Sequence, residues 1–271
     1  MDLRQRVRNR LASCEQGPGI LDTQTHNALA SFQSAMAKLF LKGVRYLKCY
    51  RDLAFGSWPE TLEEIVDYCV DRPVLMGQVR SEILQLGRIV QELAPRRSLE
   101  LGTNYGGTLL LLCRISPPGA KIISLDLPNG RFGGGYPRRK IPLFNRFPRA
   151  GRQLHLVRGD SHALGTKERI LRILEGEPLD YLFIDADHTY AGVRRDFEMY
   201  APLVRSGGIV VFHDIVSYRQ ETECQVEKFW NEIKRQYRHL EIVEASSNGT
   251  LPVAITRAPM ETAGLGVLYV P

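Results

Sequence analysis

The spacing of apolar residues changes near residue 97 and divides the chain into two patterns. Before that point, apolar residues recur every three or four positions, as on one face of an amphipathic helix. After it, short apolar runs alternate with amphipathic segments, which is typical of a parallel sheet covered by helices on both faces. The pattern therefore predicts an α/β protein with a doubly wound sheet.

The elements that these patterns predict can be placed along the chain. Strands are expected at residues 98–101, 121–126, 154–158, 181–185, 208–213, 240–244 and 264–270. Residues 252–256 compete with the last of these segments for the role of final strand. Helices are expected at residues 61–70, 78–92, 107–115, 167–175, 191–203 and 225–237.

The N-terminal part, residues 1–77, is predicted to be a helical extension of the main domain, residues 78–271. Its first helix carries an apolar stripe that includes Leu29, Phe32 and Met36, next to a stripe of Lys and Arg side chains. Such a basic helix can pack against the main domain, close a substrate site or form the interface of a homo-oligomer. It can also contact an anionic membrane surface, here through residues 35–51.

A segment rich in Gly, Pro and Arg, residues 129–152, separates the second and third predicted strands. Structureless connections of this length usually have a function, so we expect a lid over a binding site. Its expected contacts with a substrate are the aromatic side chains Phe132, Tyr136 and Phe144 and the basic side chains Arg138, Arg139 and Lys140.

Composition limits the class of protein. The 271 residues, 44% of them apolar, suffice for the core of one α/β domain with an extension. No apolar run reaches the roughly 20 residues of a membrane span, and the first residues lack the apolar centre of a secretory signal. We therefore expect a soluble, cytoplasmic protein. The five cysteines are widely spaced and form no C-x-x-C pair, so they are interpreted as reduced, structural thiols.

The net charge of +6 favours an anionic partner or a solvated basic surface. The excess lies at the N-terminus, within residues 38–51 and within residues 131–152. Aromatic residues rarely alternate with these charges, and no nucleic-acid-binding motif is present, so DNA is not an expected partner. A small-molecule acceptor with an acidic group fits the basic lid segment.

Polar residues gather where each predicted parallel strand ends. The carboxyl ends of parallel strands meet at one edge of an open sheet, and ligands bind there. The first strand leads into SLELGTNYGGT, residues 98–108, a glycine-rich turn whose backbone N–H groups can approach a small polar ligand. The residues at this edge are Glu100, Gly102, Thr103, Asn104, Gly106, Gly107, Asp126, Gly159, Asp160, Ser161, Asp185, Asp187, His188, His213 and Asp214.

The glycine-rich turn differs from the two common phosphate-binding turns. A dinucleotide fingerprint, G-x-G-x-x-G, has glycine where Asn104 stands here. A P-loop has Lys followed by Ser or Thr after its last glycine, whereas residues 107–109 read Gly-Thr-Leu. Glu100, at the end of the strand, would repel a pyrophosphate and attract an ammonium group.

The acids that follow the next two strands suit a nucleoside. Asp126 can accept hydrogen bonds from both hydroxyls of a ribose, and Asp160 or Ser161 can meet the amino group of adenine. A nucleoside with a cationic, amino-acid-like tail satisfies these residues together with Glu100. That ligand is S-adenosylmethionine.

These residues resemble class I S-adenosylmethionine-dependent methyltransferases, in the branch of the macrocin and mycinamicin sugar O-methyltransferases and the cephalosporin hydroxylase-like proteins. The matching segments are SLELGTNYGGT, SLDLPNG, RGDSH, LFIDADHTYAGVRRDFEMY and LVRSGGIVVFHD, and the resemblance covers residues 78–237. It implies a Rossmann-like sheet of seven strands whose last strand is antiparallel. It also implies transfer of a methyl group to a hydroxyl of a sugar or small natural product.

By this resemblance, Asp185, His213 and Asp214 are expected to hold a divalent metal, Mg²⁺ or Mn²⁺, and His188 to be the general base. His213 departs from the family pattern, which has an acid there, and a histidine also admits softer ions. A histidine with an ordinary pKa can take a proton at neutral pH. The expected cofactor-binding residues are Glu100, Gly102, Thr103, Asn104, Gly106, Asp126, Asp160, Ser161 and Asp185.

Several alternatives stay open at this point. His213 can make a hydrogen bond near the cofactor instead of binding metal, and His188 can cap the helix that follows it. The two histidines and an acid can form the iron site of an oxygenase. Methyl transfer to RNA or to a lipid, or a regulatory role in which the cofactor is bound without turnover, also agrees with the sequence.

Overall fold

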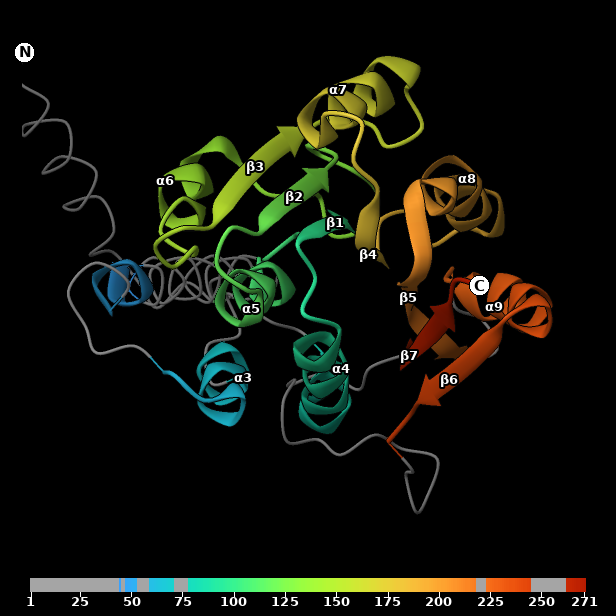
Figure 1. The fold of residues 1–271 in the computed structure, drawn as a ribbon, viewed down its shortest axis with the longest axis horizontal. Helices are drawn as coiled ribbons and strands as arrows, with labels where there is room; N and C mark the ends of the chain where they lie inside the picture. The colour runs from blue at the N-terminus through green and yellow to red at the C-terminus, as the bar shows by residue number, and fades with distance from the viewer. Residues whose placement is uncertain (1–43, 45–46, 53–58, 71–77, 218–222, 245–261) are drawn as a thin grey trace, which may run out of the picture. The chain divides into compact units, whose positions relative to one another are not determined.

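The computed structural model describes residues 44, 47–52, 59–70, 78–217, 223–244 and 262–271 (Figure 1). The chain divides into two units, residues 1–47 and 48–271. Most of the extension predicted at residues 1–77, and most of the basic helix at residues 35–51, lie outside the described residues. The boundary at residue 77 and the membrane contact therefore stay predictions.

The second unit contains a seven-stranded sheet with the strand order β3-β2-β1-β4-β5-β7-β6. All neighbours from β3 to β5 pair in parallel, whereas β7 is antiparallel to both β5 and β6. The prediction of a doubly wound, seven-stranded sheet with an antiparallel last strand is confirmed. The strands are β1 (Arg97–Leu101), β2 (Lys121–Asp126), β3 (Gln153–Arg158), β4 (Leu179–Ile184), β5 (Val204–Ser217), β6 (Arg238–Ile242) and β7 (Thr262–Tyr269).

Helices cover both faces of this sheet (Figure 1). The helices α3, α4 and α5 lie on one face, and α7, α8 and α9 lie on the other. Within the described ranges, no helix has both the length and the apolar content that a bilayer span requires. The helices are α3 (Leu62–Val70), α4 (Arg80–Leu93), α5 (Gly107–Ile115), α6 (Ile141–Phe144), α7 (Leu164–Leu174), α8 (Tyr190–Tyr200) and α9 (Val226–Ile233).

The two faces of β1 carry different chemistry because successive side chains of a strand point to opposite sides. Leu99 and Leu101 are fully buried in the apolar core that α8 and α9 complete with Phe197 and Trp230. Glu100 points to the other face, where it meets α5. The core therefore fixes the register of the strand, and this register places an acid beneath the glycine-rich turn.

Two elements differ from the sequence-based prediction. β5 extends over Val204–Ser217, well beyond the expected 208–213, because β4 pairs with its first residue, Val204, and β7 pairs with it as far as Ser217. Residues 129–152 are not a structureless loop, since they contain a 3₁₀ helix, Arg138–Lys140, and α6. Only the first part of that segment, residues 130–133, lines the cavity described below.

The chain reversal after β1 requires a glycine. Gly102 has a φ of 85°, which is in the left-handed region, and a Cβ atom there would overlap the carbonyl oxygen of Asp185. We expect Gly102→Ala to lower the free energy of unfolding by about 1–3 kcal/mol, because side chains are strained at this φ and the strands would have to separate. Urea unfolding followed by circular dichroism measures this change.

Gly165, near the start of α7, supplies the matched control. Among the described residues, no atom outside the adjacent residues and the backbone of α7 lies within 4 Å of a Cβ built at that glycine. Gly165→Ala is expected to raise the free energy of unfolding by about 0.4–1 kcal/mol, because alanine restricts the unfolded chain. A Gly102→Ala variant as stable as the Gly165→Ala variant would contradict the steric argument.

Candidate active site

A cavity of about 530 Å³ opens at the carboxyl edge of the sheet, at the point where the strand order reverses between β1 and β4. Its walls come from the turns that follow β1, β2, β3, β4 and β5 and from residues 130–133. A volume of this size suits a small-molecule ligand. Of the residues expected at the site, Glu100 and Gly106 do not line the cavity, and the following do: Gly102, Thr103, Asn104, Asp126, Asp160, Ser161, Asp185, His188, His213 and Asp214.

Glu100 lies behind the glycine-rich turn, not in the cavity wall. Its carboxylate is fully buried and accepts hydrogen bonds from the hydroxyls of Thr103, at 2.7 Å, and Thr108. Burial raises the pKa of Glu100 to about 8, although both hydroxyls lower it. The expectation that Glu100 meets the ammonium of the ligand is therefore corrected: this side chain fixes the turn to the start of α5.

The glycine-rich turn and the start of α5 form one wall of the cavity. Gly106 immediately precedes α5 with a φ of 92°, and a Cβ atom there would lie 2.7 Å from the ring of Phe144. Asn104 also has a positive φ, and its N–H donates to Asp126 at 2.8 Å. The turn is thus held on one side by an aromatic ring and on the other by a carboxylate.

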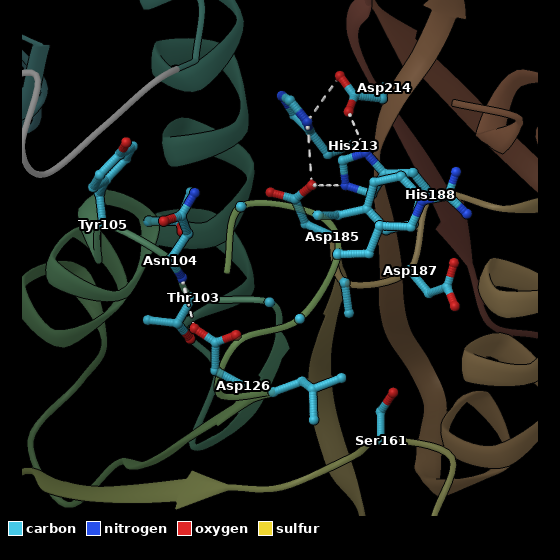
Figure 2. Close-up of a pocket in the computed structure, with 18 of the residues that line it drawn as sticks. Thr103, Asn104, Tyr105, Asp126, Ser161, Asp185, Asp187, His188, His213 and Asp214 are labelled. Carbon is cyan, nitrogen blue, oxygen red and sulfur yellow. Dashed lines mark hydrogen bonds and ion pairs between the residues drawn. The ribbon is translucent and has the colours of Figure 1, made fainter. Parts of the chain in front are cut away.

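Asp126 ends β2 and is nearly buried at the cavity wall. One of its carboxylate oxygens, Oδ2, accepts from the N–H groups of Asn104 and Tyr136, the latter at 3.1 Å. Burial raises the pKa of Asp126, and these backbone hydrogen bonds lower it. The side chain is therefore fixed in one orientation at the edge where a ribose is expected (Figure 2).

The turn after β3 is tied to α8. Asp160 accepts from the N–H of His162 at 2.8 Å, and the hydroxyl of Tyr200 donates to the carbonyl oxygen of Ser161 at 2.8 Å. His162 Nε2 lies 3.2 Å from the buried carboxylate of Asp196, whose hydrogen bond raises the pKa of His162. His162 lines the cavity and was not identified from the sequence, because its acidic partner is 34 residues away.

Four ionisable side chains meet at the ends of β4 and β5, as Figure 2 shows. The carboxylate of Asp185 lies 3.3 Å from His188 Nε2 and 3.4 Å from His213 Nδ1. The carboxylate of Asp214 lies 3.4 Å from His188 Nδ1 and 3.1 Å from His213 Nδ1. Asp214 has a φ of 61°, at the point where the register between β5 and β7 shifts. This irregularity allows consecutive residues, His213 and Asp214, to contribute to one cluster.

The charges of this cluster control its protonation. Burial alone would lower the pKa of His188, but its acidic neighbours and Cys224 outweigh burial and raise the pKa to about 10. Burial would raise the pKa of Asp185, but the imidazoles of His213 and His188 hold it well below its ordinary value. These neighbours shift the pKa of His188 upward from the ordinary value that was expected from the sequence.

The ring of Phe132 and the thiol of Cys224 also contact His188. The ring of Phe132 stacks on it with a centroid distance of 4.8 Å and an interplanar angle of 14°. Arg131, next to Phe132, forms an ion pair of 2.9 Å with Glu223, close in sequence to Cys224. Phe132 therefore covers one face of the His188 ring and lines the cavity, where the sequence predicted an aromatic wall.

Other predicted contacts of the lid segment are corrected. Tyr136 and Phe144 are almost completely buried and pack edge to face, so neither lines the cavity. Lys140 is also buried: its Nζ donates to the carbonyl oxygen of Asn104 at 3.0 Å and lies 4.7 Å from the ring centre of Tyr105. Lys140 therefore supports the glycine-rich turn and is not available to hold an acidic substrate.

The residues predicted to bind metal fit a divalent cation. Asp185, His213 and Asp214 offer ligand atoms that lie within 4.8 Å of one another. Both ring nitrogens of His213 are buried; Nδ1 lies between the carboxylates of Asp185 and Asp214, and Nε2 has no hydrogen-bond partner among the described residues. Two carboxylates and one imidazole suit Mn²⁺, Fe²⁺ or Zn²⁺ at least as well as Mg²⁺.

The fold and the cavity define the class of protein. A doubly wound sheet with a ligand cavity where the strand order reverses, between β1 and β4, is Rossmann-like. Residues 99–215, from β1 into β5, match the family model of a methyltransferase domain. This part of the chain is therefore similar to a methyltransferase domain.

Comparisons with individual proteins extend over different parts of the chain. Catechol O-methyltransferase B of Danio rerio is 32% identical over 83 residues, which are 30% of this chain and 31% of that protein. The uncharacterized protein y4gI of Sinorhizobium fredii is 28% identical over 148 residues, 54% of this chain and 16% of that protein. The matched part covers less than a third of either relative.

Solved structures share the fold. Cofactor-bound Rv0187 from MTB superimposes with a TM-score of 0.51 at 18% identity, over 81% of this chain and 93% of that chain. An O-methyltransferase from Bacillus cereus in complex with SAH gives a TM-score of 0.50 at 20% identity, over 82% of this chain and 96% of that chain. At this level of identity, the likeness concerns the arrangement of the strands and helices.

Proposed function

We propose that this protein transfers the methyl group of S-adenosylmethionine to a hydroxyl oxygen of a sugar or another small natural product, with a divalent cation at Asp185, His213 and Asp214. One observation carries the proposal: a single cavity joins a nucleoside-type site to a cluster of two carboxylates and two histidines. The solved O-methyltransferase with this fold that contains SAH supports the choice of cofactor.

The cofactor is placed by the turns after β1, β2 and β3. Asp126 accepts from the ribose hydroxyls, and the wall formed by residues 102–104 and the start of α5 encloses the amino-acid end. Asp160 or Ser161 accepts from the adenine amino group. This orientation directs the sulfonium methyl toward Asp185 and the histidines, on the other side of the cavity (Figure 2).

The acceptor hydroxyl lies between the methyl group and the ionisable cluster. A bound cation would orient this hydroxyl and lower its pKa. The positive charge of the cation would then offset the negative charge of Asp185 and Asp214. These carboxylates would raise the pKa of His188 less than they do without the cation, so that His188 could act as a base. His188 Nε2 can accept the hydroxyl proton while the S–CH₃ bond breaks and an O–CH₃ bond forms, which leaves S-adenosylhomocysteine and the methyl ether.

Cation binding predicts a thermal shift that requires Asp214. We expect MnCl₂ to raise the melting temperature of the wild type, because an ion that binds only the native state adds about 2.7 kcal/mol at a hundred times its Kd. Asp214→Asn should abolish the shift, since it removes a charged ligand while asparagine tolerates the positive φ at this position. Differential scanning calorimetry of the wild type and of Asp214→Asn, with MnCl₂ and with EDTA, measures the shift in melting temperature of each protein.

Asp67→Asn is the matched control, because Asp67 lies on α3 in a surface ion pair with Arg80 and outside the cavity. This variant should keep the full shift with MnCl₂. An equal shift in the Asp214→Asn variant would exclude Asp214 as a ligand.

Transfer of labelled methyl from S-adenosylmethionine to a panel of sugars and phenols tests the proposed function. We expect S-adenosylhomocysteine to form in step with a labelled ether, and EDTA to suppress both. Binding of the cofactor without transfer to any acceptor would favour the regulatory alternative. No binding of the cofactor, together with oxygen consumption in the presence of iron, would favour the oxygenase.

A further inference from the structure

Cys224 lies beside the ionisable cluster, although the sequence classifies it only as a structural thiol. It precedes α9 and is half-buried. Its Sγ, one imidazole nitrogen of His188 and one carboxylate oxygen of Asp214 all lie within 4.8 Å of one another. The thiol also contributes to the raised pKa of His188. A thiol, an imidazole and a carboxylate, three groups that bind metals, therefore lie close together.

The orientation of each ligand separates this set from the site of Asp185, His213 and Asp214. His188 directs Nε2 toward Asp185 and Nδ1 toward Asp214. Asp214 directs Oδ1 toward His213 and Oδ2 toward His188. One carboxylate can thus serve two neighbouring sites, with one oxygen in each.

The distances fit a tetrahedral metal. His188 Nδ1 and Asp214 Oδ2 are 3.4 Å apart. Ligands at about 2.1 Å from a tetrahedral zinc ion are separated by about 3.4 Å, and a thiolate lies slightly farther out because Zn–S bonds are about 2.3 Å long. The imidazole and the carboxylate are already at this separation, and only Cys224 Sγ has to approach.

We propose that Cys224, His188 and Asp214 form a second metal site, which takes thiophilic divalent ions of the zinc class and shares Asp214 with the neighbouring site. A thiolate ligand selects such ions over Mg²⁺. Binding displaces one proton from Cys224 Sγ and one from His188 Nδ1, and no group is oxidised or reduced.

This second site has a consequence that rests on the proposed function. An ion bound at His188 Nδ1 uses the lone pair of that nitrogen, and Nε2 keeps its proton. His188 then cannot accept a proton from the acceptor hydroxyl. Zinc-class ions are therefore inhibitors of the transfer reaction, in contrast to the ion held by Asp185 and His213.

Titration of the metal-free full chain with Co²⁺ tests the site without any enzymatic assay. The wild type should develop a thiolate-to-cobalt charge-transfer band, and Cys224→Ser should lose it. Asp185→Asn should keep the band, because Asp185 belongs only to the neighbouring site. Cys113→Ala, which removes a buried thiol of α5 outside the cavity, is the matched control and should also keep it.

The absence of the band in the wild type, or its persistence in Cys224→Ser, would overturn the proposal. A second measurement uses only the wild type and does not depend on the folding of a variant. Zn²⁺ should slow the alkylation of Cys224 by iodoacetamide, followed by mass spectrometry, and Mg²⁺ at the same concentration should not. Equal rates with the two ions would contradict the site, whatever the outcome of the methyl-transfer assay.

Discussion

His188→Ala is expected to lower the rate of methyl transfer by about 10²–10⁴-fold, the usual contribution of a general base. The imidazole lies between Asp185 and Asp214 and lines the cavity where the acceptor hydroxyl is placed. Affinity for S-adenosylmethionine should change little, because the ribose and adenine contacts come from other turns. Steady-state kinetics and calorimetric titration of the cofactor measure the two effects separately.

His239→Ala is the control for this result, since His239 is an exposed residue of β6 and does not line the cavity. It should turn over at the wild-type rate. His188→Ala also leaves the half-buried carboxylate of Asp185 and the buried carboxylate of Asp214 with one imidazole partner fewer, so its melting temperature has to be compared with that of the wild type. Unchanged turnover in a folded His188→Ala variant would exclude His188 as the base.

Asp126→Ala is expected to weaken binding of S-adenosylmethionine by about tenfold to hundredfold. Hydrogen bonds to a charged group contribute about 1.5–3 kcal/mol, and the carboxylate also holds Asn104 N–H and Tyr136 N–H in place. Asp126→Asn keeps one acceptor oxygen and should therefore lose less affinity for S-adenosylmethionine than Asp126→Ala. Isothermal titration calorimetry with both variants gives the two affinities.

Asp67→Ala, on α3 outside the cavity, is the control for the loss of an aspartate and should bind the cofactor like the wild type. An Asp126→Ala variant with wild-type affinity would contradict the placement of the ribose. It would also remove the main argument that the cavity is built for a nucleoside.

The regular parts of the fold could be predicted from the sequence because they depend on local periodicity. The helix expected at residues 107–115 is α5, and the strand expected at 121–126 is β2, each with the same bounds. The C-terminal limit of β5 could not be predicted, since β7 extends it and comes about 45 residues later in the chain. Pairing of distant strands leaves no local signal.

Periodicity also failed to predict the structure of the lid segment, residues 129–152. The helix α6 contains only four residues, which is too short for a recognisable repeat. Tyr136 and Phe144 were expected at the substrate because they stand in a Gly- and Pro-rich segment, yet they are buried against each other. Aromatic side chains bury large apolar areas, and this gain favours a packed segment over an open loop.

The sequence by itself determined the class of fold and the acids at the strand ends, because alternation along a strand decides which residues reach the carboxyl edge. The tertiary structure decided what those residues do there. It placed Glu100 behind the turn, set two carboxylates within 3.4 Å of the His188 ring and brought Cys224 to the same ring from beyond β5. The energy of an ion pair and the binding of a metal both change strongly when the distances between side chains change by a few ångströms. The sequence pattern does not specify distances on that scale, and only the folded chain fixes them.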